Sequence, residues 1–161
     1  MTSLRPMTQE AYPAFFENAA TGYAAQNVAG GRWRSEDAAD LARAETARLL
    51  PQGLETPDNY VFDVVDDVDG KAVGYLWFAV APRGSIKIAF VCQVTIYPTF
   101  QGQGHARAAL ALVEQRAKEL GLAGMALHVF AYNKAARGLY ESAGYEVSSL
   151  NMIKPFGRGD A

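Results

Sequence analysis

The sequence predicts an α/β domain built on a central mixed sheet, and two features of its apolar pattern carry this prediction. Between residues 60 and 96, apolar side chains recur with the spacing of strands, and short polar turns separate the runs. After Pro98 the spacing changes to three and four residues, which is typical of an amphipathic helix. Because this helix lies between two apolar strands, it can form the crossover that parallel neighbours require. We therefore expect antiparallel early strands and one parallel pair.

The first part of the chain, residues 1–59, predicts a short strand followed by two helices. Thr8 and Ser35 are expected to cap these helices, because their hydroxyls can accept hydrogen bonds from the first helical turn. Pro51 is expected to end the second helix. The expected elements are a strand at residues 3–7, a helix at 9–27 that contains Pro13, a break at Gly30 and Gly31, and a helix at 36–50.

The remainder of the chain predicts a meander of three strands, then alternating helices and strands. An Asp-rich turn at residues 66–70 separates the first two strands, and it lacks the glutamate of a calcium-binding loop. The expected elements are strands at residues 60–65, 72–80 and 86–96, a helix at 106–120 that ends at Gly121, a strand at 125–130, a helix at 134–143 that ends at Gly144, a strand at 145–153 and a frayed tail at 155–161.

Length and composition exclude several classes of protein. The 161 residues match one domain, and we expect residues 1–161 to form it. The formal net charge of −2 provides no basic excess, so we expect no nucleic-acid partner. No stretch of the sequence approaches the ~20 apolar residues of a membrane span, so we expect no membrane partner. The single cysteine and the absence of a leader pattern favour a cytoplasmic protein.

A glycine-containing loop, Gln101-Gly102-Gln103-Gly104-His105-Ala106, joins a predicted strand to a predicted helix. The backbone N–H groups of such a loop and the helix dipole favour a phosphate group. The alternative is a tight turn with no ligand, and the loop by itself does not decide between these interpretations. A dinucleotide-binding fingerprint fits less well, because Arg107 stands where its third glycine would be. A Walker loop is absent.

A second group of residues lies on one face of the following helix. The spacing of Asn133, Ala136 and Tyr140 lets them line one groove, where they offer an amide, a small side chain and a hydroxyl. Each residue taken alone also has an ordinary structural interpretation, as an N-cap, a helix-packing alanine and a half-buried tyrosine.

Together, the motifs Gln101-x-x-Gly104-x-Ala106 and Asn133-x-x-Ala136-x-x-x-Tyr140 resemble those of the GCN5-related N-acetyltransferase superfamily. The resemblance covers about residues 90–147. It implies antiparallel N-terminal strands and a parallel central pair that is splayed around acetyl-CoA. It assigns residues 86–147 to the acetyl-CoA-binding core and residues 1–59 to the acceptor side. The implied activity is direct transfer of the acetyl group to a primary amine of a small molecule or peptide.

The resemblance also implies roles for individual residues. The diphosphate of acetyl-CoA falls to Gln101, Gly102, Gln103, Gly104, His105, Ala106 and Arg107. The pantetheine arm falls to the backbone of Val94 and Ile96, and its sulfur lies near Asn133, Ala136 and Tyr140. We expect the backbone N–H of Val94 to stabilise the developing oxyanion and Tyr140 to donate to the departing sulfur.

The general base is left open by the sequence. Many members of this superfamily carry a carboxylate where this chain has Gln93, and an amide accepts no proton at neutral pH. His128 is the candidate base, with a packed strand histidine or a water relay to a distant glutamate as alternatives. A catalytically inactive acyl-CoA-binding module therefore stays open as a second function.

Other side chains complete the expectations. Tyr23, Asn27 and Trp33 are candidates for acceptor contacts, because the N-terminal helices of this superfamily often cover that site. Cys92 is expected to pack as a small apolar residue, with a covalent acyl-enzyme as the alternative. One cysteine and two histidines suggest no metal framework. A homodimer formed through the early strands is possible.

Overall fold

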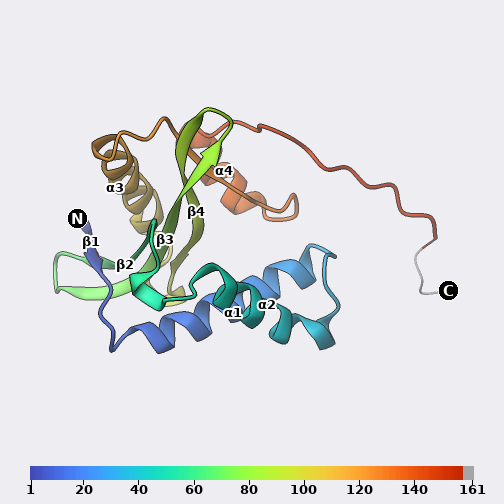
Figure 1. The fold of residues 1–161 in the computed structure, drawn as a ribbon, viewed down its shortest axis with the longest axis horizontal. Helices are drawn as coiled ribbons and strands as arrows, with labels where there is room; N and C mark the ends of the chain where they lie inside the picture. Colours follow the sequence, from blue (N-terminus) through green and yellow to red (C-terminus); the bar gives the residue numbers. More distant parts are fainter. Residues whose placement is uncertain (158–161) are drawn as a thin grey trace.

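A five-stranded sheet with helices on both faces forms the body of the protein in the computed structural model, which describes residues 1–157 (Figure 1). The elements are β1 (Thr2–Pro6), α1 (Tyr12–Ala29), α2 (Ser35–Leu49), β2 (Asn59–Asp66), β3 (Lys71–Arg83), β4 (Ile86–Ile96), α3 (His105–Glu119), β5 (Met125–Leu127) and α4 (Lys134–Ser142). Short 3-10 turns occupy Gly53–Glu55 and Pro98–Phe100.

The sheet confirms the predicted mixed topology. Its strand order follows the chain, β1-β2-β3-β4-β5. The first four strands pair antiparallel, and β4 pairs with β5 in parallel. Helix α3 makes the crossover between the two parallel strands.

Strand β3 shows how the sequence builds a core on each face of the sheet, because neighbouring side chains of a strand point in opposite directions. Leu76 and Phe78 pack in the cluster that contains Val113 of α3. Tyr75 and Trp77 pack in the cluster that contains Phe15 of α1. The apolar residues of β3 are therefore buried on both faces, with α3 on one side and α1 on the other.

The parallel pair separates soon after it forms. Pairing between β4 and β5 runs from Ala89 opposite Met125 to Val91 opposite Leu127, whereas β4 itself continues to Ile96. The register between β3 and β4 shifts beside Cys92, which places a bulge at the point where β5 leaves. The second half of β4 therefore borders a gap in the sheet.

The boundaries of α1 differ from the prediction. The helix begins at Tyr12, its N-cap is Ala11, and Pro13 lies in its first turn, where a missing N–H costs no helical hydrogen bond. Thr8 instead accepts a hydrogen bond from the N–H of Ala11 in the turn that precedes the helix, at 3.2 Å. The cap predicted at Ser35 falls on the preceding residue, Arg34.

The largest correction concerns the end of the chain. Residues 145–153 form no strand, so this prediction was wrong, and the strand predicted at 125–130 is paired only at Met125–Leu127. The segment after Tyr145 extends away from the body (Figure 1). Part of the predicted frayed tail, residues 158–161, lies outside the described residues.

Within the described part of the chain, no helix is long and apolar enough to cross a membrane.

Candidate functional site

The glycine loop leads directly into α3 and leaves the N-terminus of that helix open. Gly102 and Gly104 have φ angles of +79° and +85°, a left-handed conformation that favours glycine, and the four residues 101–104 are exposed. Gly104 is the N-cap residue, no side chain caps the helix, and the first turn carries no acidic residue. The first N–H groups of α3 therefore point from the loop with the positive end of the helix dipole behind them.

Arg107 adds a full positive charge near this helix end. Its exposed guanidinium group donates a hydrogen bond to the hydroxyl of Ser142, at the end of α4. The contact joins α3 and α4 beside the loop, so an anion at the N-terminus of α3 would lie close to a fixed cation.

The side chain of His105 points in the opposite direction, into the protein. It is 6% exposed, and its Nδ1 lies 2.9 Å from the hydroxyl of Thr2 in β1. Its Nε2 is buried without a hydrogen-bond partner among the described residues and lies 3.8 Å from Oδ2 of Asp66. The imidazole thus anchors the start of α3 to β1 and β2, while the backbone N–H of His105 stays with the loop.

The second half of β4 presents backbone groups to the gap beside β5. The N–H of Tyr97 donates to the carbonyl of Val73 in β3, at 2.8 Å. Because the direction of these groups alternates along a strand, the N–H groups of Val94 and Ile96 point away from β3. The amide of Gln101 donates to the carbonyl of Ile96, at 2.9 Å, which supports this orientation and ties the glycine loop to the edge of β4.

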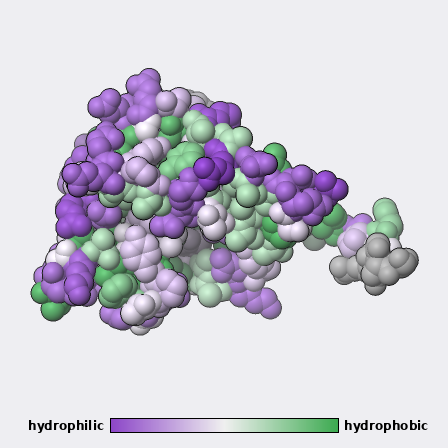
Figure 2. Space-filling model, turned by 90° about the horizontal axis from the view of Figure 1, so that it is seen from below, coloured by the Kyte–Doolittle hydropathy of each residue, from purple (hydrophilic) through white to green (hydrophobic). Residues whose placement is uncertain are grey.

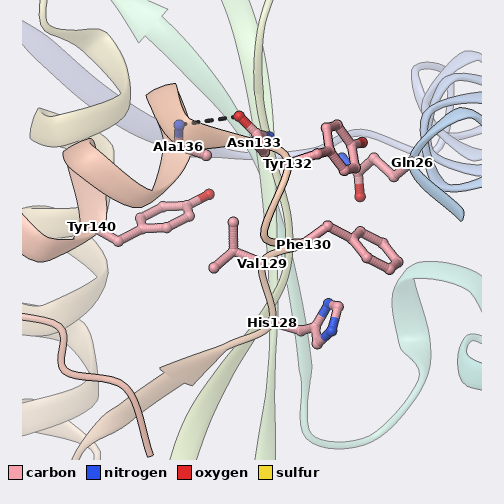
Figure 3. Close-up of a pocket in the computed structure, with 8 residues that line it drawn as sticks. All are labelled: Gln26, His128, Val129, Phe130, Tyr132, Asn133, Ala136 and Tyr140. Carbon is pink, nitrogen blue, oxygen red and sulfur yellow. Dashed lines mark hydrogen bonds between the residues drawn. The ribbon is translucent and has the colours of Figure 1, made fainter. Parts of the chain in front are cut away.

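Helix α4 places its motif residues around a pocket close to this gap (Figure 3). Asn133 is the N-cap of α4, and its Oδ1 accepts a hydrogen bond from the N–H of Ala136, at 3.1 Å. Asn133 is therefore an N-cap, as its structural interpretation predicted, and its Nδ2 group takes no part in that hydrogen bond. The half-buried Tyr140 turns its hydroxyl toward the pocket, and burial raises the pKa of this phenol.

His128 lies on the other side of the same segment. His128 and Phe130 extend in one direction and Val129 extends toward Tyr140, as expected of an extended chain (Figure 3). The imidazole ring meets the Phe130 ring edge-on, with centroids 4.8 Å apart. Partial burial, and then the positive charge of Arg32, lower the pKa of His128. A neutral imidazole therefore lies on the side of this segment toward α1, and a neutral phenol lies on the side toward α4.

Gln93 has a partner in the structure. Its side chain is 9% exposed, and its Nε2 donates to the carbonyl of Ala19 in α1, at 3.3 Å. The amide of Gln93 therefore joins β4 to α1. This contact needs a donor, which a carboxylate cannot provide.

The candidate acceptor residues lie near the C-terminal end of α1. Tyr23 and Trp33 are half-buried and pack edge-on, with ring centroids 5.3 Å apart. Asn27 is 0% exposed: its Nδ2 donates to the carbonyl of Tyr23, and its backbone carbonyl accepts from Arg32 and Trp33. Asn27 thus holds the loop after α1 in place, and it exposes no atom that could contact an amine substrate.

Sequence reasoning missed several residues that line the pocket. They are Gln26, Val129, Phe130 and Tyr132. A Cβ atom added at Gly30 would lie 2.5 Å from the Phe130 ring, so the end of α1 packs directly against this segment. Because side chains alternate along an extended segment, residues 128–132 could have been predicted to line both of its sides. The contact with α1 depends on tertiary packing.

Cys92 offers no reactive thiol. It is half-buried at the bulge of β4, and burial raises its pKa to about 12. A half-buried thiol that stays neutral supports the packing interpretation over the covalent one. The described residues contain no group of three or more His, Cys, Asp or Glu side chains that could hold a metal ion.

Comparisons with known proteins identify relatives of the chain. A model of the acetyltransferase (GNAT) family matches residues 15–145. The uncharacterized N-acetyltransferases YdgE and YycN of Bacillus subtilis (strain 168) are 33% and 35% identical to the chain over 152 residues, which is 94% of this chain and 96% of each relative. The crystal structure of YycN superposes with a TM-score of 0.91 at 33% identity and covers 98% of this chain and 100% of that chain.

A more distant structure shares the fold. AAC(6')-Iy in complex with the bisubstrate analogue CoA-S-monomethyl-acetylneamine superposes with a TM-score of 0.64 at 17% identity, over 98% of this chain and 99% of that chain. The family match spans most of the sequence, and both curated relatives exceed 30% identity over nearly their full length. This chain belongs to the acetyltransferase (GNAT) family.

Proposed function

We propose that the protein is an acetyl-CoA-dependent N-acetyltransferase that moves the acetyl group directly onto a primary amine. The observation that carries the proposal is the arrangement around the gap between β4 and β5. The open N-terminus of α3 lies beside one end of the gap, and Tyr140 and His128 lie on opposite sides of the segment 128–132, which continues from β5. Membership in the acetyltransferase family supports the reaction class.

The chain offers acetyl-CoA a set of groups that suits its chemistry. The uncapped N–H groups of residues 104–107 and the guanidinium of Arg107 suit a diphosphate. The N–H of Ile96 and the carbonyl of Val94, which point away from β3, suit the amides of the pantetheine arm. Acetyl-CoA supplies the thioester that is attacked, and the protein positions it in the gap.

Backbone groups at the gap also suit the charge that develops during transfer. When the amine attacks, the carbonyl oxygen of the acetyl group becomes negative and requires a donor that is fixed beforehand. We assign this role to the N–H of Val94, which follows the bulge of β4. The bulge gives this N–H a position that a regular strand would not.

His128 is assigned as the base on the acceptor side. An alkylammonium group has a pKa of ~10.4 and an ordinary imidazole ~6.5, so prior proton transfer would be uphill by ~4 units or ~5 kcal/mol. Since an ammonium has no lone pair, the amine attacks as the neutral free base, which is a minor fraction near neutral pH. Its nitrogen becomes much more acidic as the bond to carbon forms, so His128 accepts the second proton, which is lost during or after attack. Its lowered pKa keeps the ring neutral and ready to accept.

Tyr140 is assigned as the donor to sulfur. A thiol has a pKa of ~8.5 and an ordinary tyrosine ~10, so full proton transfer would be uphill by at least ~2 kcal/mol. Burial raises the pKa of Tyr140, which increases the difference between its pKa and that of the thiol. Tyr140 therefore stabilises the departing thiolate by a hydrogen bond rather than by complete transfer.

The test is to incubate the purified chain with acetyl-CoA and a panel of amino acids, polyamines, aminoglycosides and peptides. Free thiol release and the mass of the acetylated product are measured together. We expect release that depends on one class of amine. Binding of acetyl-CoA without turnover on any amine would instead favour an inactive acyl-CoA-binding module, an alternative that the amide of Gln93 supports.

A further inference from the structure

An arginine places a positive charge on the acceptor side of the candidate site. Arg32 is exposed and lies in the loop between α1 and α2. The end of α1 packs on the segment that carries His128, because a Cβ added at Gly30 would lie 2.5 Å from the Phe130 ring. The charge of Arg32 also acts on His128, since it helps to lower the pKa of that imidazole. A cation therefore lies close to the assigned base.

A buried asparagine holds Arg32 in position. Asn27 is 0% exposed, and its Oδ1 accepts a hydrogen bond from Nη1 of Arg32, at 3.4 Å. Its backbone carbonyl accepts from the N–H of Arg32, at 2.8 Å, and its own Nδ2 donates to the carbonyl of Tyr23. This contact uses one of the five N–H donors of the guanidinium. The fork that the others form matches the geometry of a carboxylate.

The next arginine of the loop differs, because its charge is neutralised. Arg34 pairs with Glu36 at 3.3 Å and with Asp37 at 3.0 Å. Among residues 1–157, no carboxylate forms an ion pair with Arg32. A charge of this kind beside a site attracts anions and repels cations. Helices α1 and α2 form the face seen in Figure 2, where hydrophilic side chains are spread among apolar ones, which suits the approach of a polar acceptor.

The charge of Arg32 favours one kind of acceptor. Attack requires the neutral amine, and a nearby positive charge disfavours its ammonium form. The same charge repels an acceptor that carries further ammonium groups, such as a polyamine. It attracts an acceptor that carries a carboxylate, whose two oxygens can accept parallel hydrogen bonds from the guanidinium.

We propose that the acceptor is an amino acid, whose carboxylate pairs with Arg32 while its amine meets the thioester beside His128. The amine nitrogen bonds to the acetyl carbon and the C–S bond breaks. The proton that the nitrogen loses passes to His128, and coenzyme A leaves as the thiolate. Asn27 is the positioning residue, since it acts through Arg32. This inference rests on the proposed function for its reaction and adds the class of acceptor.

Paired acceptors test the inference. Each member of a set of amino acids is compared with its own C-terminal amide, which lacks the negative charge. The amine of the amide loses its proton more readily, so a preference for the acid cannot arise from the pKa of the amine. The variants are Arg32→Gln and Arg32→Lys. Arg34→Gln is the matched control, because it removes an arginine of the same loop whose side chain is 74% exposed.

We expect the wild type and Arg34→Gln to prefer the acid of at least one pair by ~10-fold or more in kcat/KM. Arg32→Gln should abolish or reverse this preference, mainly through the KM of the acceptor, with the KM of acetyl-CoA unchanged. Arg32→Lys keeps the charge without the fork, so it should restore only part of the preference. Melting temperatures check that all variants fold.

A measurement that needs no turnover separates the two proposals. NMR signals of the His128 ring, assigned with His128→Gln, are followed in the presence of coenzyme A while each acceptor is added. We expect an amino acid, but not its amide, to shift these signals in the wild type, and neither to shift them in Arg32→Gln. If this result comes without acetylation of any amine, only the proposed function fails.

Three results would overturn the inference. The first is turnover that favours polyamines or the amides over the amino acids. The second is a preference for the acid that survives Arg32→Gln or is lost equally in Arg34→Gln. These two results would leave N-acetyl transfer itself intact. The third is an absence of both turnover and a shift of the His128 signals with every amino acid.

Discussion

At the scale of single residues, the candidate site contains a neutral hydrogen-bond donor, Tyr140, and a neutral proton acceptor, His128. Burial raises the pKa of Tyr140 and lowers that of His128, so both side chains are uncharged near neutral pH. The phenol is suited to donate a hydrogen bond, and the imidazole is suited to accept a proton. Their positions on opposite sides of the segment 128–132 separate the two tasks (Figure 3).

Tyr140→Phe removes the hydroxyl and keeps the ring. We expect kcat to fall by ~10- to 1000-fold with little change in the affinity for acetyl-CoA, because the lost bond matters as sulfur gains charge. Steady-state kinetics and calorimetric titration with acetyl-CoA check this together. Weaker binding with unchanged turnover would show that the hydroxyl only positions the substrate.

The pH profile tests His128. Its folded pKa is lowered, so the neutral form persists to a lower pH than in an unfolded chain, and the acidic limb that it contributes to kcat at saturating amine should lie below ~6.5. His128→Gln should lower kcat ~100- to 10,000-fold and remove this acidic limb. An acidic limb that is unchanged in the variant would assign the base to another group.

Cys92 should be unreactive in the folded enzyme. With a pKa of about 12, its thiolate is a tiny fraction at pH 8, so Ellman's reagent should label it only after unfolding. Cys92→Ala should retain turnover within a few-fold of the wild type. Loss of activity in a folded Cys92→Ala variant, or a labelled acyl-enzyme, would point to covalent catalysis.

At the scale of elements, the loop before α3 depends on the left-handed conformation of Gly104. A Cβ added there meets nothing within 4 Å, so Gly104→Ala costs mainly backbone strain, ~1 kcal/mol of unfolding free energy. Gly70→Ala is a matched control, since Gly70 also has a positive φ, +73°, and open space around it.

Both variants should melt slightly below the wild type. Only Gly104→Ala should weaken acetyl-CoA binding, by ~10-fold or more, because its relaxed loop misaligns the N–H groups of α3. Calorimetry on both variants checks this. Equal binding in the two variants would mean that the loop does not hold the diphosphate.

The elements also show what the sequence could and could not predict. Periodicity placed β2, β3, β4 and α3 within a few residues, because a local pattern decides which face of each is buried. The segment 145–153 has an equally apolar composition but forms no strand, since a strand requires a neighbour and local sequence names none. Two further features depend on where α1 packs, so the local sequence could not predict them either: the side toward which His128 projects, and the burial of Asn27.

At the scale of the whole molecule, the two faces of the sheet provide separate routes to the site for the two substrates. Helices α1 and α2 cover one face, and α3 covers the other, while the gap between β4 and β5 connects the two (Figure 1). Acetyl-CoA is proposed to enter along α3 and α4, and the amine from the side of α1. The two substrates would meet at the gap without passing each other.

A crystal structure of the chain grown with coenzyme A tests this account most directly. We predict that the diphosphate lies on the N–H groups at the start of α3, that the pantetheine arm follows Val94 and Ile96, and that the sulfur lies beside the hydroxyl of Tyr140. Coenzyme A bound elsewhere on the surface, or a gap between β4 and β5 that stays empty at saturating ligand, would contradict it.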